Sequence, residues 1–346
     1  MIRPKSRASR QVWTLFAGLG LVTSCLFPAQ VFKYRKTEPA RGCLLKNVPY
    51  EKWLKRNYCG PACLAMVLNY WDETRPYDQA EITAAIFDSA SQATYNSEMV
   101  LYPRGKGFAS YSFQGTLEAL KDLVGKGIPV IVLTKTIQQI AKGHYRVVIG
   151  FDDAKGQIIF HDPFLGGRRA MKFKTFMKVW ELGKGRNQSR WTMAVFPEKD
   201  PFPFAALQND PLTAINLATA YYRRSDFLKS REQWENVRGS LSGDPYPLYS
   251  LAMVSLREGN AAEAEALALQ ALRLDEKSAY ALDVLGLAHA RQGRISEALQ
   301  SLEQAQRLAP NEKFIRMHYL QVRALGIEKA RPDQIKKKEN QNEETS

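Results

Sequence analysis

Cys59 has the side chain in this sequence that is best suited to nucleophilic chemistry. It lies in the segment Asn57-Tyr58-Cys59-Gly60-Pro61, directly before an apolar spacing that predicts a helix over 61–71. Pro61 suits a first helical turn, because its missing N–H leaves no hydrogen bond unmade there. A thiol at this position meets the positive end of the helix dipole, which lowers its pKa and favours the thiolate. We therefore predict that Cys59 is a nucleophile and that backbone N–H groups around Gly60 can bind an oxyanion.

The base that such a thiol needs must come from one of only four histidines. His144 opens the strand-like run His-Tyr-Arg-Val-Val-Ile-Gly-Phe-Asp, and Asp162 follows about one hairpin later. Adjacent antiparallel strands would bring these two side chains together. The order Cys, His, Asp then fits a mechanism in which the imidazole takes the thiol proton and the carboxylate orients the ring.

Other residues compete for these roles. His161 is an alternative base, and Asp152 and Asp153 are alternative carboxylates, although their position at a strand end is typical of a turn. The other two histidines, His289 and His318, lie in the helical repeats described below, and His289 stands at a position where packing is expected.

Cys63 follows Cys59 by one helical turn and is expected to be a small buried hydrophobe. A disulfide between Cys43 and Cys63 is the weaker alternative. Nothing indicates a metal or an organic cofactor, because four histidines and no Cys-x-x-Cys pair offer little for metal ligation.

The elements around these residues predict an α+β domain over 46–198, with helices packed on an antiparallel sheet. Helical patterns cover 61–71, 80–87, 115–124 and 173–182, and short β-branched runs cover 129–133, 145–151, 157–160 and 191–196. The glycine-containing stretch 102–108 lacks the spacing of a phosphate loop. We interpret it as a loop on the substrate side of the domain or as a plain surface loop.

A repeat with a period of 34 residues follows the first domain. Leu251 corresponds to Leu285 and Gly259 to Gly293, and a weaker copy at 211–244 has Ser225 where the others have glycine. This period and its small residues are typical of tetratricopeptide repeats, in which paired helices pack closely. We predict a linker over 199–210, repeats over 211–326 with a capping helix from 313, and a disordered charged tail over 327–346.

The first 24 residues read as an export signal. A basic segment precedes the apolar run 12–22, which is too short to span a bilayer of about 30 Å. The run ends in Val22-Thr23-Ser24-Cys25, which resembles a bacterial lipobox, so Cys25 is the expected lipidation site and 25–45 a tether. This resemblance implies an exported lipoprotein of the cell envelope, on the outer membrane facing the periplasm. The alternative is an ordinary signal peptide.

The formal net charge of +14 favours acidic partners or anionic surfaces. No stripe of stacking aromatic and basic residues accompanies it, so nucleic acid is not an expected partner. The odd number of cysteines left after Cys25 argues against a disulfide framework.

The segment around Cys59, the run from His144 to Asp152 and the pair Asp162-Pro163 together resemble the bacteriocin-processing, double-glycine leader peptidase family. That resemblance implies a papain-like fold, with Cys59 as nucleophile, His144 as base and Asp162 as orienting group. Stand-alone relatives include lipoproteins that carry tetratricopeptide repeats, and this chain looks like one of them.

The chain departs from this family at one position. The family usually has a glutamine about six residues before the nucleophile, whose side chain completes the oxyanion hole, and Trp53 occupies that place here. Asn57 is a poorly placed substitute, and the loss of such a donor costs on the order of 10²–10³ in rate. We therefore expect a thiol peptidase acting on a peptide or protein. The alternatives are an inactive peptide-binding module, another acyl-transfer enzyme, and a scaffold whose repeats alone matter.

Overall fold

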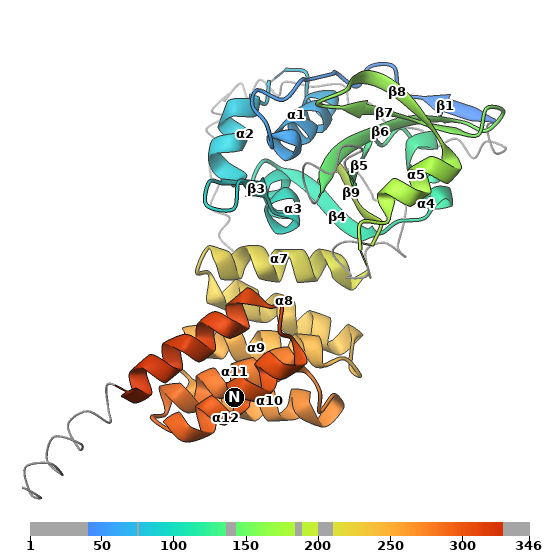
Figure 1. The fold of residues 1–346 in the computed structure, drawn as a ribbon. Helices are drawn as coiled ribbons and strands as arrows, with labels where there is room; N and C mark the ends of the chain where they lie inside the picture. The colour runs from blue at the N-terminus through green and yellow to red at the C-terminus, as the bar shows by residue number, and fades with distance from the viewer. Residues whose placement is uncertain (1–40, 75, 136–142, 184–188, 200–209, 328–346) are drawn as a thin grey trace, which may run out of the picture. The chain divides into compact units, whose positions relative to one another are not determined.

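The structure is a computed structural model that describes residues 41–74, 76–135, 143–183, 189–199 and 210–327 (Figure 1). The predicted export signal, Cys25 and nearly all of the predicted tail lie outside these ranges. Within them, no helix combines the length and the apolar character that crossing a bilayer requires.

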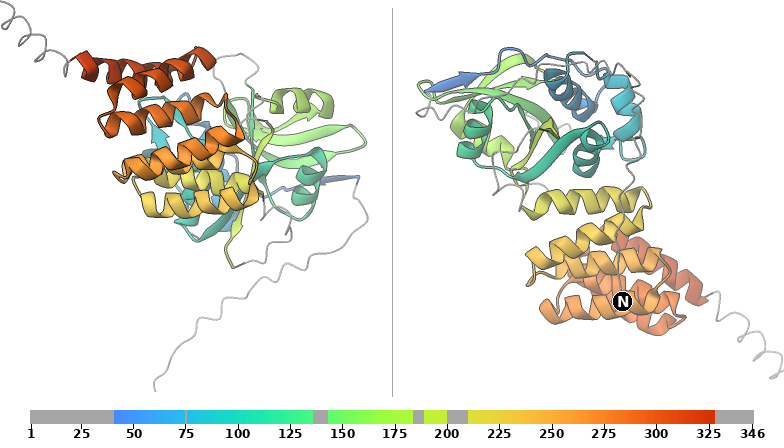
Figure 2. Two further views of the ribbon diagram at one scale, coloured as in Figure 1. Left: turned by 90° about the horizontal axis from the view of Figure 1, so that it is seen from below. Right: turned by 180° about the vertical axis from the view of Figure 1, so that it is seen from behind.

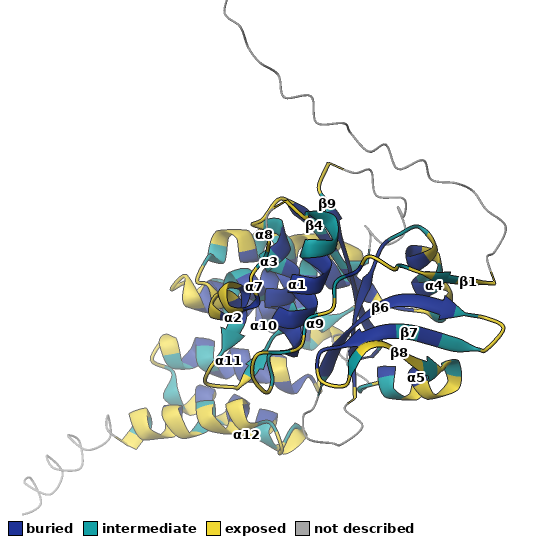
Figure 3. Ribbon diagram, turned by 90° about the horizontal axis from the view of Figure 1, so that it is seen from above, coloured by how far each residue is buried: buried dark blue, intermediate teal, exposed yellow. Residues whose placement is uncertain are grey.

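An antiparallel sheet of seven strands forms the centre of the first domain. Six strands run in the spatial order β4 (Phe108–Gln114), β9 (Trp191–Pro197), β5 (Val130–Thr134), β6 (His144–Asp152), β7 (Gln157–Asp162) and β8 (Gly166–Lys172). The seventh, β1 (Gly42–Leu44), pairs with the far end of β6. Figure 3 shows β6 and β7 as largely buried ribbons, so side chains on these two strands are shielded from water.

Helices cover both faces of this sheet. One face packs against α1 (Cys59–Trp71), α2 (Gln79–Ile86) and α3 (Asn96–Arg104), and the other against α4 (Leu117–Gly125) and α5 (Phe173–Trp180). The period-2 alternation of a strand explains the division. In β5, Ile131 and Leu133 join the first core, whereas Val130 and Val132 join the second. A small hairpin of β2 (Phe87–Asp88) and β3 (Ala93–Thr94) connects α2 to α3.

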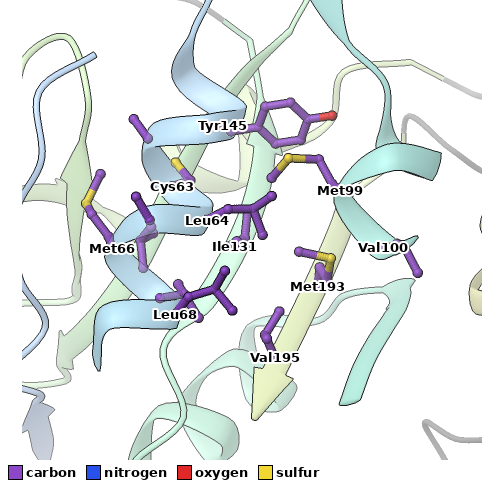
Figure 4. Close-up of a cluster of buried hydrophobic side chains, with 14 of the residues drawn as sticks. Cys63, Leu64, Met66, Leu68, Met99, Val100, Ile131, Tyr145, Met193 and Val195 are labelled. Atoms are coloured by element: carbon purple, nitrogen blue, oxygen red, sulfur yellow. The ribbon is translucent and has the colours of Figure 1, made fainter. Parts of the chain in front are cut away.

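Helix α1 is the most deeply buried helix of the domain, because its residues from Cys59 to Leu68 are all buried. Figure 4 shows Cys63, Leu64 and Leu68 among side chains from β5, β6, β9 and α3. A helix that is apolar nearly all round must be enclosed by other elements. This enclosure fixes the helix and, with it, the position of Cys59 at its first residue.

The second part of the chain is an array of antiparallel helix pairs (Figure 2). The pairs are α7 (Pro211–Arg223) with α8 (Phe227–Ser240), α9 (Pro245–Arg257) with α10 (Ala261–Leu274), and α11 (Ala279–Arg291) with α12 (Ile295–Leu308), followed by a helix over 313–327. The turn inside each pair contains one residue with positive φ: Ser225 at 61°, Gly259 at 85° and Gly293 at 82°. The 34-residue period therefore marks the same backbone conformation in every repeat.

Helix α7 packs against the first domain as well as into the core of the repeats. Thr213 satisfies both backbone groups of Ser112 in the edge strand β4, because its hydroxyl accepts from the Ser112 N–H (2.9 Å) and donates to the Ser112 carbonyl (3.0 Å). Leu212 and Leu217 belong to the core of the sheet, whereas Ile215 and Ala218 belong to the core of the repeats. The helix thus covers a sheet edge that would otherwise expose free backbone groups.

The prediction of an α+β domain followed by a helical array is confirmed. Several elements differ from the prediction. Strands β4 and β8 and helix α3 were not expected, and the stretch 102–108, which we interpreted as a loop, contains the end of α3 and the start of β4. The predicted tether over 25–45 overlaps the domain, because residues 42–44 form β1. Three residues are too few to show a period, so the sequence carries no signal for that strand.

Candidate active site

Cys59 is the first residue of α1, and only 7% of it is exposed. Burial raises the pKa of its thiol, but several interactions outweigh this effect and hold the pKa below its ordinary value. They are a hydrogen bond with His144, the positive charge of that ring, and bonds from the backbone N–H groups of Tyr145 and Gly60 to the sulfur. The expected thiolate-favouring environment is therefore present at this residue.

His144 is the first residue of β6 and interacts directly with Cys59. Burial lowers the pKa of the imidazole, but its hydrogen bonds to Asp162 and to the thiol raise it to about 9. The Nε2–H donates to Oδ1 of Asp162 at 2.8 Å. The Nδ1 nitrogen is therefore the one left to serve the sulfur. Opposite pKa shifts of a thiol and an imidazole in contact are what a thiolate–imidazolium pair requires.

Asp162 ends β7 and is completely buried. Burial raises its pKa, but the bond to His144 and the positive charges of His144 and Arg146 hold the pKa well below its ordinary value. Its Oδ1 also accepts from the backbone N–H groups of Phe164 (2.9 Å) and Leu165 (3.0 Å) in the turn that follows. The carboxylate is thus fixed on the side that holds the imidazole, as expected for an orienting group.

Arg146 belongs to the same site, although the sequence analysis gave it no role. Its Nε donates to Oδ2 of Asp162 at 2.8 Å, and it is 2% exposed. The available signal was its spacing, because residues 144 and 146 of one strand share a face. The register opposes Val147 to His161, which makes Arg146 and Asp162 neighbours across the two strands.

His161, the alternative base, has both ring nitrogens occupied elsewhere. Its Nδ1 accepts from the backbone N–H of Arg168 at 2.9 Å, so its Nε2 donates to the carbonyl of Val48 at 3.0 Å. Burial lowers the pKa of this ring, which favours its neutral form. His161 ties β7 to the segment before α1 and does not compete for Cys59.

The alternative carboxylates lie at the opposite end of β6 from His144. Asp152 accepts from the backbone N–H of Lys155 at 3.0 Å, and Asp153 pairs with Lys121 at 2.5 Å. Asp152 therefore serves a turn, as its sequence position indicates.

Trp53, which occupies the place of the expected glutamine, packs on the base. Its ring lies edge-on to His144, with centroids 5.7 Å apart and planes at 82°, and it also contacts Phe164 at 5.0 Å. A glutamine from elsewhere, Gln79 of α2, lies nearby, but its amide is bonded to the backbone of Lys52 and Leu54. Gln79 thus holds the segment that carries Trp53 in place.

The two residues proposed for the oxyanion differ in their surroundings. Gly60 is buried, and a Cβ there would come within 3.0 Å of Thr94 and Met99, so close packing rather than substrate approach requires this glycine. Its backbone N–H nevertheless helps to lower the pKa of the Cys59 thiol. Asn57 has a φ of 72°, a left-handed conformation that asparagine tolerates better than most residues. An oxyanion role for either residue remains a prediction.

The remaining cysteines and histidines make no recorded hydrogen bond to Cys59, His144 or Asp162 in the part of the chain that the structure describes. Cys43, Cys59 and Cys63 are all free thiols, so the alternative disulfide between Cys43 and Cys63 does not form. Cys63 is completely buried in the apolar core, and this burial raises its pKa well above the ordinary value. In the repeats, His318 bonds to Asp283 at 2.9 Å and His289 lies 3.4 Å from Glu265.

Comparisons with known proteins agree with this division of the chain. Residues 45–187 match the Peptidase_C39 like family, and residues 245–270 and 279–312 match models of the tetratricopeptide repeat. Comparison with curated proteins gives no match. The chain therefore joins a Peptidase_C39-like domain to tetratricopeptide repeats.

Solved structures are similar to each part separately. The peptidase domain of Streptococcus ComA, described as a bifunctional ABC transporter of a quorum sensing pathway, is 22% identical over 43% of this chain and 98% of its own, with a TM-score of 0.36. The second tetratricopeptide domain of human RPAP3, solved with an HSP70 peptide, is 19% identical over 33% and 94%, with a TM-score of 0.30. The Sgt2 repeat domain of Aspergillus fumigatus is 18% identical over 35% and 82%, with a TM-score of 0.33.

Proposed function

We propose that the protein is a cysteine peptidase that cleaves a peptide or protein substrate through Cys59, His144 and Asp162. The observation that carries this proposal is the buried chain of contacts from the thiol through the imidazole to the carboxylate, in which the pKa of Cys59 is lowered and that of His144 is raised. A purely structural cysteine, such as Cys63, has its pKa raised instead.

The reaction follows from this arrangement. The Cys59 thiolate attacks the substrate carbonyl carbon and forms a C–S bond, and the carbonyl electrons move to the oxygen. The N–H of Cys59, at a helix start where backbone amides lack intrahelical acceptors, stabilises that oxyanion. The imidazolium of His144 then gives its proton to the leaving amine as the C–N bond breaks. In the second half, His144 takes a proton from water, which attacks the thioester and releases the acid and the thiolate.

Two further features complete the proposal. The repeats hold a peptide or protein partner, because such arrays present extended surfaces for binding. The chain is exported and anchored by a lipid on Cys25. Anchoring is tested by comparing the membrane fraction of the wild type with that of Cys25→Ala, which should be released into the soluble fraction.

Cleavage is tested with the full chain and a library of peptides from denatured envelope proteins, with new amino termini identified by mass spectrometry. Wild type should produce cuts that are absent with Cys59→Ala and strongly reduced with His144→Ala. Equal cutting by wild type and Cys59→Ala would overturn the proposal.

A second function, peptide binding without cleavage, is favoured by Trp53 in the place of the oxyanion glutamine. In that case wild type and Cys59→Ala would retain the same library peptides with equal affinity, and no new amino terminus would appear.

A further inference from the structure

Arg146 is a buried cation behind the nucleophile that bonds directly to Asp162 and, through Thr134, reaches the backbone of His144. Its Nε donates to Oδ2 of Asp162 at 2.8 Å, and its Nη1 donates to the hydroxyl of Thr134 and to the carbonyl of Lys135 at 3.3 Å. The Thr134 hydroxyl in turn donates to the backbone carbonyl of His144 at 3.0 Å. The guanidinium of Arg146 therefore holds the carboxylate that orients the imidazole. Through Thr134 it also holds the backbone of His144, which carries that imidazole.

The charges of the site require such a cation. The proposed mechanism places a thiolate on Cys59 and a proton on His144, and these two charges cancel. The ionised Asp162 then leaves one negative charge in a region where all three side chains are buried. An uncompensated buried charge is strongly destabilising. With Arg146 the site contains two cations and two anions, so the buried group is neutral overall.

We propose that Arg146 is the positioning residue of this site and the counter-charge that allows a carboxylate, rather than a neutral amide, to orient His144. This inference rests on the proposed thiol chemistry. It assigns a role to a residue that touches neither the thiol nor the substrate. The bond explains the geometry, because the Nε of Arg146 occupies Oδ2 of Asp162 and leaves Oδ1 directed at Nε2 of His144.

Removal of this positive charge should raise the pKa of every titratable group that faces it. The charge of Arg146 lowers the pKa of Asp162 on β7 and of Cys63 on α1. The other titratable groups of this region are Cys59 on α1, His144 and Tyr145 on β6, and Tyr50 before α1. The charge argument therefore predicts a shift in pH dependence, whereas a purely structural role predicts a loss of folded protein without such a shift.

The test follows the alkylation of Cys59 by iodoacetamide across pH in the full chain, with each cysteine quantified separately by mass spectrometry. In Arg146→Met the midpoint for Cys59 should move upward by about one pH unit, a tenfold loss of reactivity on the acid limb. Arg146→Lys keeps the charge but cannot bond to Asp162, Thr134 and Lys135 in the same geometry, so its midpoint should stay near that of the wild type. Cys43 lies outside the site and reports whether the fold is intact.

The double variant Arg146→Met with Asp162→Asn supplies the decisive comparison. It removes one charge of each sign and leaves an amide oxygen to accept from Nε2 of His144. Its midpoint should return to within a few tenths of a pH unit of the wild type. An unchanged midpoint in Arg146→Met, or a double variant no better than Arg146→Met, would overturn the inference.

These results stay interpretable if the single methionine variant does not fold. In that case the double variant should recover both the fold and the wild-type midpoint, and failure of the double variant to fold overturns the counter-charge role. The proposed function fails separately. If Cys59 of the wild type titrates like an ordinary thiol, with a pKa of about 8.5, the thiol chemistry is wrong before Arg146 is considered.

Discussion

The indole of Trp53 lies edge-on to the imidazole of His144, with ring centroids 5.7 Å apart. This contact covers the ring whose Nε2 bonds to Asp162, and an edge-to-face pair is worth about 0.5–1.5 kcal/mol. We expect Trp53→Ala to lower kcat/KM on a cleaved peptide by up to about tenfold, because the bond from His144 to Asp162 then meets water. Trp53→Phe keeps a ring at this position and should retain most of the activity. Equal activity of the alanine variant and the wild type would show that the ring does not support the base.

The pKa shifts predict how the thiol responds to pH. Cys59 should alkylate at about pH 6 far faster than an ordinary thiol, because its pKa is lowered by His144. Cys43 and Cys63 are internal controls, since burial raises the pKa of both. Similar rates for all three thiols across pH would contradict this prediction, and His144→Asn should abolish the difference.

Peptide cleavage should fall as pH rises through about 9, where His144 loses the proton that the leaving amine needs. The same shift affects stability. The folded pKa of His144 lies above its unfolded value of about 6.5, so this pairing stabilises the fold fully below that pH and stops contributing as pH rises through about 9. Rate profiles and urea melts across this range check both statements.

Ser225 takes the left-handed conformation that Gly259 and Gly293 take in the later repeats. This conformation costs about 1–2 kcal/mol for a residue with a Cβ and almost nothing for glycine. We expect Ser225→Gly to raise the free energy of unfolding by about 1 kcal/mol. The reciprocal change Gly259→Ser should lower it by a similar amount, because no atom lies within 4 Å of its added Cβ and only the backbone is affected. Urea denaturation measures both, and a less stable Ser225→Gly or a more stable Gly259→Ser would refute the argument.

Gly286 of α11 lies where α12 approaches closely. An added Cβ would come within 2.6 Å of Leu302 and 2.9 Å of the carbonyl of Ala298. We expect Gly286→Ala to destabilise the fold by about 1–3 kcal/mol through overpacking. Gly239→Ala is the matched control, since nothing lies within 4 Å of its Cβ and helix propensity alone should make it stabilising. Equal effects of the two changes would disprove the close approach.

The sequence predicted the parts of the site that depend on local pattern. Cys59 before Pro61 indicates a helix start, and the β-branched run after His144 indicates a strand, and both elements form where expected. The choice between His144 and His161 could not come from periodicity. The choice depends on which histidine has a ring nitrogen available for Cys59. Both nitrogens of His161 are bonded to the backbone, to Val48 and to Arg168, and the bond to Val48 joins segments far apart in the sequence.

The missed elements have physical reasons. Strand β8 lies at a sheet edge and is mostly exposed, so its sequence Gly-Gly-Arg-Arg-Ala-Met-Lys lacks the apolar alternation of a half-buried strand. The sequence gives no indication of a role for Arg146, because an arginine in a strand usually faces solvent. Its burial is favourable only because the neighbouring strand supplies the carboxylate of Asp162.

The double packing of α7 determines where the chain can be divided. By repeat period this helix opens the array, yet Leu212 and Leu217 complete the apolar core beneath β4, and Thr213 closes that strand's edge. A protein truncated within 199–210 would lose these residues. The edge strand β4 would then expose unpaired backbone groups that favour aggregation. Proteins in which the first domain is separated from the repeats, or is joined to foreign repeats, should therefore be divided in the turn over 241–244, so that α7 and α8 stay with the first domain.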